Sequence, residues 1–194
     1  MSKEYNIQDI VDPGIEQGAS QVSPERIRQV VNQVLSSEGV ARLKAYTSAC
    51  VACGLCSDAC HYFLSHDRSP RYSPVAKVKD TIWTMLNTKG PISRDFMKEA
   101  ARIAHTECNL CRRCVQYCPF GIDTAFLMST VRRIVHKLGM TPQYIQDTAH
   151  SHSATMNQMW IKDDEWIDAL IWQEEEARDE FPHIRIPLEK DGAD

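Results

Sequence analysis

The spacing of the cysteines constrains this 194-residue chain more than any other feature of its sequence. All eight cysteines fall into two copies of the pattern C-x2-C-x2-C-x3-C. The second copy repeats the first at a constant offset of 58 residues, and no cysteine is left over. The copies comprise Cys50, Cys53, Cys56 and Cys60, and then Cys108, Cys111, Cys114 and Cys118. We interpret them as one metal-binding motif in duplicate.

Three thiolates at this spacing can wrap a loop around one face of a [4Fe–4S] cluster, and the fourth cysteine then points elsewhere. In two-cluster ferredoxins that fourth cysteine ligates the other cluster. The spacing therefore predicts two [4Fe–4S] clusters with crossed ligand sets. Cluster 1 would be held by Cys50, Cys53, Cys56 and Cys118, and cluster 2 by Cys108, Cys111, Cys114 and Cys60.

A disulfide framework and a pair of zinc sites are the other interpretations of eight cysteines. Disulfides suit secreted proteins, but residues 1–6 are polar and lack the apolar core of a signal peptide. Cysteines at C-x2-C spacing also pair poorly with one another. Zinc is usually held by paired C-x2-C units on either side of a loop, often with histidine. A repeated triplet with a single further cysteine matches iron–sulfur chemistry better.

The composition describes a folded protein with an acidic end. A hydrophobic content of 43% supports a core, and no apolar run approaches the roughly 20 residues of a membrane helix. We therefore expect no direct insertion into a membrane. Residues 1–160 carry a net charge of +4, whereas residues 161–194 carry −8. The positive charge is too weak to predict a nucleic-acid partner.

Helix-start residues followed by apolar residues at helical spacing recur along the chain. The expected helices begin at Ser23, Ser73, Ser93, Asp123, Thr141 and Asp163 or Asp164. Two of them lie between the cysteine motifs, and we find no series of alternating strand patterns with hairpin turns. The sequence predicts a mainly α fold, an alpha-helical ferredoxin with two cluster-binding loops between helices.

Three segments follow from this pattern. We expect an irregular N-terminal arm at residues 1–22, a domain that binds both clusters at residues 23–140, and a helical, acidic extension at residues 141–194. The extension carries an apolar stripe on an otherwise acidic helix, which either packs on the chain's own core or contacts a partner subunit. Packing on the chain's own core is the default for the stripe, and we expect the extension as a whole to contact a partner subunit. The stripe consists of Trp166, Ile167, Leu170 and Ile171.

Several residues beside the cysteines have two interpretations each. Gly54 and Gly121 would allow close approach of the backbone to a cluster or would serve as ordinary turn residues, and Pro119 would fix a turn. Arg112 and Arg113 would raise the potential of cluster 2 or form surface ion pairs.

The histidines are less informative. His61 would donate to a cluster sulfur or simply pack, and packing is the default. His150 and His152 form a superficial metal pair with no third ligand nearby, so we expect a surface segment there.

The motifs and the helical pair between them resemble the alpha-helical ferredoxin domain. The chain resembles the C subunit of heterodisulfide reductases and the N-terminal half of the K subunit of the membrane complex linked to dissimilatory sulfite reductase. The resemblance runs from about Thr47 onward and rests on CVACGLC (50–56), CHYF (60–63), CRRC (111–114) and CPFGID (118–123). One departure is His61, which stands where many ferredoxins have proline, as this chain has at Pro119.

The resemblance implies an electron-transfer subunit of a heterodisulfide-reductase-like complex in sulfur metabolism, without a catalytic site of its own. Longer relatives continue into Cys-Cys-Gly (CCG) motifs that bind a catalytic cluster, and this sequence contains none. The implied partners are a CCG-domain catalytic subunit, similar to the B subunit of heterodisulfide reductases, and another redox subunit. The implied location is the cytoplasm, at the inner face of the membrane through those partners.

Other members of the same fold supply the alternatives. The chain would be an iron–sulfur subunit of a glycolate oxidase or fumarate reductase type, or a fragment of a longer protein that continues into the CCG domain. Fumarate reductase iron–sulfur subunits also carry an upstream [2Fe–2S] domain, and no cysteine precedes Cys50 here.

Overall fold

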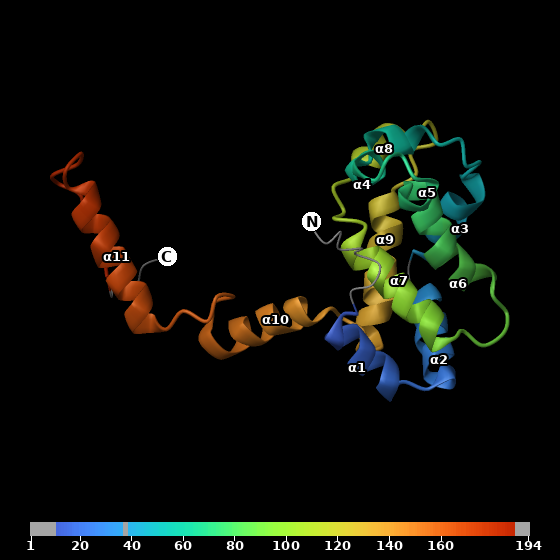
Figure 1. Cartoon of the computed structure of the whole chain (residues 1–194), viewed down its shortest axis with the longest axis horizontal. Helices are drawn as coiled ribbons and strands as arrows, with labels where there is room; N and C mark the ends of the chain where they lie inside the picture. The colour runs from blue at the N-terminus through green and yellow to red at the C-terminus, as the bar shows by residue number, and fades with distance from the viewer. Residues whose placement is uncertain (1–10, 37–38, 189–194) are drawn as a thin grey trace, which may run out of the picture. The chain divides into compact units, whose positions relative to one another are not determined.

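The computed structural model describes residues 11–36 and 39–188, which fall into two compact units, Met1–Gln143 and Tyr144–Asp194 (Figure 1). These described residues form helices and no strand, so the predicted mainly α fold is confirmed. None of the described helices is both long and apolar enough to span a membrane. Residues 1–10 of the predicted arm and 189–194 of the extension lie outside the described residues.

The first unit is an assembly of short and medium-length helices. Its elements are α1 (Pro13–Gln21), α2 (Pro24–Leu35), α3 (Val40–Ala49), the 3₁₀ turn η2 (Leu55–Ala59), α4 (His61–Ser65), the 3₁₀ turn η3 (Pro70–Tyr72), α5 (Pro74–Val78), the π turn η4 (Lys79–Trp83), α6 (Thr84–Asn87), α7 (Arg94–Thr106), α8 (Arg113–Gln116) and α9 (Thr124–Lys137). The remaining helices are α10 (Gln143–Thr155) and α11 (Asp163–Ala177).

Side-chain caps start the main helices where the sequence predicts. In each case a serine or aspartate oxygen accepts a hydrogen bond from a backbone N–H in the first turn, which the helix itself cannot satisfy. The caps of α2, α5, α7 and α9 are Ser23, Ser73, Ser93 and Asp123. These four predicted helix starts are confirmed.

Residues 13–21 form helix α1, whereas the sequence analysis expected an irregular arm there. Asp12 caps the helix by accepting hydrogen bonds from Gly14 N at 2.9 Å and Ile15 N at 3.1 Å, and Pro13 occupies its first position. Glycine lowers helix propensity, so Gly14 and Gly18 obscured the signal. Tertiary packing explains Gly18, because a Cβ there would lie 2.2 Å from the carbonyl oxygen of Gly139.

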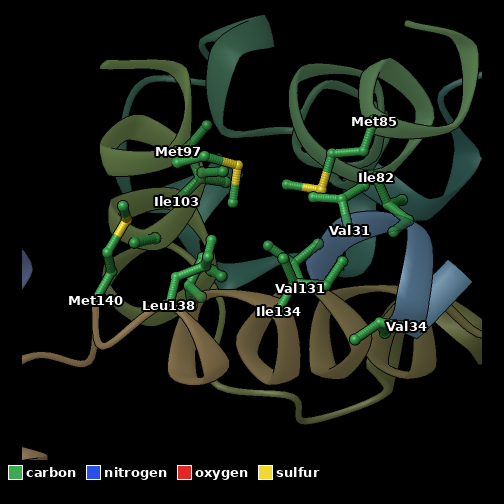
Figure 2. Packing of buried hydrophobic residues seen from close by; sticks show 14 of the residues in the cluster. Val31, Val34, Ile82, Met85, Met97, Ile103, Val131, Ile134, Leu138 and Met140 are labelled. Carbon is green, nitrogen blue, oxygen red and sulfur yellow. The ribbon is translucent and has the colours of Figure 1, made fainter. Parts of the chain in front are cut away.

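The core of the first unit lies between α7 and α9, with α1, α2 and α5 packed around them. Figure 2 shows side chains of these helices meeting there, among them Val31 of α2, Met97 of α7 and Ile134 of α9. All three are fully buried. The motif loops, with η2, α4 and α8, gather at one end of this core, where α9 begins (Figure 1).

A π turn interrupts the helix that the sequence predicts as continuous from Ser73. The hydroxyl of Thr81 donates to the carbonyl of Lys77 at 2.5 Å, and that of Thr84 donates to the carbonyl of Lys79 at 2.7 Å. These two hydroxyls bond the Lys77 and Lys79 carbonyls where the π turn widens the helix. Such turns are frequent near functional sites.

In the second unit, α10 spans 13 residues and is longer than the short helix predicted from Thr141. His150 and His152 are exposed, as expected for a surface segment. Ser151 between them is fully buried, donates to the Asn157 carbonyl at 2.9 Å and accepts from Trp160 N at 2.9 Å. The segment therefore stabilises the turn that follows α10.

Candidate metal centre

The two cysteine motifs have the same backbone conformation. Ala52 and Leu110 occupy equivalent positions and have φ values of 56° and 59°. Gly54 and Arg112 are also equivalent, with φ values of 84° and 62°. Non-glycine residues rarely adopt positive φ. Its recurrence at the 58-residue offset shows that the sequence repeat is a structural repeat.

The first hollow brings together the cysteines predicted for cluster 1. Cys50 follows α3, Cys56 lies in η2, and Cys118 lies beyond α8. With Cys53 they line a hollow, and the other described residues of its wall are uncharged. The remaining lining residues are Tyr46, Val51, Ala52, Pro74, Val75, Val78, Phe120, Ile122, Thr124 and Leu127.

The second hollow brings together the cysteines predicted for cluster 2: Cys60, Cys108, Cys111 and Cys114. Unlike the first, it has charged residues in its wall: Lys77, Glu107 and Arg112. Pro74 and Thr124 line both hollows, so the two lie next to each other.

The donor sets have the chemistry that a [4Fe–4S] cluster requires. The eight thiols are free. Among the described residues, no three or more His, Cys, Asp or Glu side chains converge as on a single metal ion; the thiols surround hollows instead. Burial, together with nearby thiols including Cys114 and Cys118, raises the pKa of Cys56 to about 11. Crowded, half-buried thiols ionise more readily beside compensating cations, which iron would supply.

Lys77 is the buried cation of the second hollow. Its side chain comes from α5, and the residue is only 3% exposed. The ammonium lies 3.6 Å from Cys60 Sγ, donates to the backbone carbonyl of Glu107, and sits 4.7 Å from the centre of the Tyr62 ring. Burial of an ammonium is costly unless an anion compensates it.

Other charges near the second hollow are paired. The Glu107 carboxylate is 3% exposed and lies 2.7 Å from Arg102 Nη2. Arg112 donates to Asp123 Oδ2 at 2.7 Å, and Asp123 also caps α9. Arg112 thus forms an ion pair, which is one of the two interpretations that the sequence allowed. Its side chain is 63% exposed.

Arg132 of α9 holds the second motif by its backbone. Its guanidinium donates to the carbonyl of Ala104 at 2.9 Å and to that of Cys108 at 2.6 Å. These bonds tie the end of α7 and the first cysteine of the motif to α9. They leave a positive charge on the same side of the site as Lys77.

The remaining motif residues form turns. Gly121 N donates to Cys118 O at 3.0 Å, which closes a turn around Pro119. A Cβ at Gly54 or Gly121 would meet no protein atom within 4 Å, so positive φ, not crowding by protein, selects glycine. His61 lines the second hollow, with its ring 4.3 Å from that of Tyr62.

Sequence reasoning missed Lys77, Glu107 and Arg132. One signal for Lys77 was available, because it shares a helical face with Pro74, Val78 and Thr81, all of which are buried. A lysine on an apolar face predicts a buried charge with a partner. No comparable pattern marks Glu107 or Arg132.

Comparison with known proteins identifies the site-bearing segment. Residues 46–122 match the family described as "4Fe-4S dicluster domain". The Hdr-like menaquinol oxidoreductase iron–sulfur subunit 2 of Archaeoglobus fulgidus is 26% identical over 187 residues, which cover 88% of this chain and 33% of that protein. The corresponding iron–sulfur subunit of Archaeoglobus profundus is 28% identical over 131 residues, covering 61% of this chain and 23% of that protein.

The chain thus aligns with a third or less of the length of these curated relatives. No solved structure matches it. The matched segment contains all eight cysteines, whose sulfur atoms line the two hollows. Residues 46–122 therefore match a 4Fe-4S dicluster domain, and the chain is similar to Hdr-like iron–sulfur subunits.

Proposed function

We propose that this chain relays single electrons through two [4Fe–4S] clusters as a subunit of a heterodisulfide-reductase-like complex. The observation that carries the proposal is the sorting of eight thiols into two adjacent hollows. When bound, each cluster supplies a one-electron redox centre. The chain holds both centres within one rigid helical unit and fixes the path between them.

The lining of the hollows supports the crossed ligand sets. The first hollow takes Cys50, Cys53 and Cys56 from one motif and Cys118 from the other. The second takes Cys60 from the first motif and the other three cysteines from the second. Because each loop contributes to both sites, the separation of the sites is set by the fold.

We propose a CCG-domain catalytic subunit and a further redox subunit as partners. The eight cysteines are occupied as ligands in this scheme, which leaves no thiol pair for disulfide chemistry on this chain. The relatives' names mention a menaquinol oxidoreductase. A quinol-oxidising partner would therefore exchange electrons with this chain at the inner face of the membrane, and the chain itself would lie in the cytoplasm.

The acidic extension is the proposed partner-binding segment. No residue of α11 is buried, and Trp166 and Trp172 are 55% and 60% exposed. Large exposed aromatic side chains are typical of interface anchors. The surrounding carboxylates favour a partner surface that combines basic residues with an apolar groove.

Metal analysis of anaerobically purified protein tests the cofactor proposal. We expect about eight iron and about eight sulfide per chain, together with the EPR signals of two interacting clusters after reduction. Zinc bound to the thiols, or iron for a single cluster, would contradict it.

Serine variants test the crossing. Cys118→Ser should alter the same EPR signal as Cys53→Ser, because both residues line the first hollow. Cys60→Ser should alter the same signal as Cys111→Ser. If Cys118→Ser instead resembles Cys111→Ser, each motif ligates its own cluster and the crossed assignment is wrong.

A further inference from the structure

We propose that Lys77 holds cluster 2 at a higher reduction potential than cluster 1, so that the second hollow is the electron-accepting end of the relay. This inference rests on the proposed function. It assigns a potential-setting role to a residue outside both cysteine motifs. It also gives the relay an internal direction.

The two hollows differ in the charge of the residues that line them. No charged side chain lines the first hollow among the described residues, whereas Lys77 projects into the wall of the second. Its ammonium approaches Cys60 Sγ to 3.6 Å and has no carboxylate within ion-pair distance in the described part of the chain. Its other neighbours are a carbonyl oxygen and an aromatic ring, neither of which carries a full charge.

Neighbouring charged side chains do not neutralise the positive charge of Lys77. Glu107 gives Lys77 only its backbone carbonyl, and its carboxylate is paired with Arg102. Arg112 is paired with Asp123, which therefore adds little net charge. Arg132, bound to the Cys108 carbonyl at 2.6 Å, adds a second positive charge on this side.

Among the residues that the structure describes, no equivalent cation lines the first hollow. Arg42 lies behind it, 5.1 Å from the centre of the Tyr46 ring and 3.6 Å from Asp123, with half of its side chain exposed. Arg42 shares the Asp123 carboxylate with Arg112, so its charge is screened mainly by the solvent around its half-exposed side chain.

The charge of Lys77 would raise the reduction potential of cluster 2. Four thiolates give a [4Fe–4S] site a net negative charge, which grows by one when the cluster is reduced. A buried ammonium against one of those sulfurs stabilises the reduced form more than the oxidised form, and burial weakens the screening. One electron would then pass from cluster 1, which is oxidised, to cluster 2, which is reduced.

Hydrogen bonds hold Lys77 at its backbone carbonyl and at its ammonium. The Thr81 hydroxyl bonds the Lys77 carbonyl at the entrance to the π turn, and the hydrogen bond to Glu107 fixes the other end of the side chain. The ammonium is thus positioned from both ends, which keeps its charge at a constant distance from Cys60.

The experiment is an EPR-monitored redox titration of the full chain with both clusters, purified anaerobically. The Cys53→Ser and Cys111→Ser variants assign each signal to a hollow. In the wild-type protein the signal of cluster 2 should form at the higher potential. Lys77→Met keeps the length of the side chain without its charge, and it should lower the midpoint of cluster 2 while leaving that of cluster 1 nearly unchanged.

Two further variants control the result. Lys77→Arg retains the charge and should keep cluster 2 the first to be reduced, and Lys98→Met removes a lysine whose partners are Glu16 and Asp95, so neither midpoint should move. The proposal is overturned if wild-type cluster 1 is reduced first, or if Lys77→Met leaves both midpoints in place. If Lys77→Met loses a cluster, Lys77→Gln removes the charge in its place, and the wild-type order still tests the predicted direction. Fewer than two clusters in the wild-type protein would instead refute the proposed function.

Discussion

Gly54 and Arg112 have the same left-handed backbone conformation although they are 58 residues apart. Glycine has no side chain, whereas arginine has a long, positively charged one. Each lies between the second and third cysteines of its motif. Arg112 accepts the strain of positive φ while its guanidinium bonds Asp123 at 2.7 Å. The loop conformation is therefore imposed by the motif, and the residue at this point is chosen by what else it can contact.

This equivalence predicts that Gly54→Ala destabilises the first loop through backbone strain alone. A Cβ at Gly54 meets no protein atom within 4 Å, so the cost should be about 1–2 kcal/mol. Ala52→Gly in the same loop relieves a positive φ and should therefore act in the opposite direction, raising stability by up to about 1–2 kcal/mol. Anaerobic urea unfolding followed by circular dichroism measures both; equal stability of Gly54→Ala and wild type would contradict the argument.

We expect Gly18→Ala to weaken the attachment of α1 to the turn after α9. The added methyl group would lie 2.2 Å from the Gly139 carbonyl oxygen, and backbone must move to admit it. The expected loss is about 1–3 kcal/mol in the free energy of unfolding. Gly90→Ala is the matched control, because a Cβ there has open space, and it should shift the unfolding midpoint little. An equal effect of both variants would show that general chain stiffness, not contact, matters.

His105 should make the protein less stable in mild acid. Both ring nitrogens are buried without a hydrogen-bond partner, and burial, followed by the charge of Arg132, lowers its pKa to about 4. Between pH 6.5 and 4 the unfolded chain binds a proton that the folded chain does not. Folding stability should therefore fall across this interval as pH decreases, by about 2 kcal/mol after allowance for the partly exposed ring.

The check is a series of unfolding curves for wild type and His105→Leu from pH 7 to pH 4. The difference between the two proteins should change in favour of the variant as the pH falls. A constant difference across the series would show that His105 does not titrate between these states.

Trp166→Glu should weaken assembly with the proposed partner subunits by at least about tenfold and leave the iron content unchanged. Trp166 is 55% exposed on a helix with no buried residue, so its loss should not disturb the folded unit. Tyr144→Glu changes a similarly exposed aromatic residue on α10 and should leave assembly intact. Co-purification and quantitative binding measure the effect. Loss of clusters in Trp166→Glu would indicate a role in folding instead.

The sequence predicts much of the helical fold because its signals are local. Ser23, Ser73 and Ser93 cap their helices through bonds to residues three positions away, and such bonds need no tertiary context. α1 has a local cap of the same kind at Asp12, but it was missed because glycine lowers helix propensity, and Gly18 is explained only by Gly139, which lies 121 residues further along the chain. Local propensity gives no information about such a contact.

The same distinction applies to the site. The eight cysteines are recognisable by their spacing, and the hollows group them as that spacing predicts. Lys77 and Glu107, 30 residues apart in the chain, are joined by the hydrogen bond from the Lys77 ammonium to the Glu107 carbonyl at the end of α7. Their effect on the site depends on burial and distance, which a sequence pattern does not contain.

Each hollow draws three cysteines from one loop and the fourth from the other. A mutation that deforms either loop therefore reaches both sites at once. The two copies of the motif are separated by 47 residues, yet the loss of one cysteine changes a hollow that the other copy also lines. With respect to substitution, the two motifs are therefore one unit, although they are two segments of the sequence.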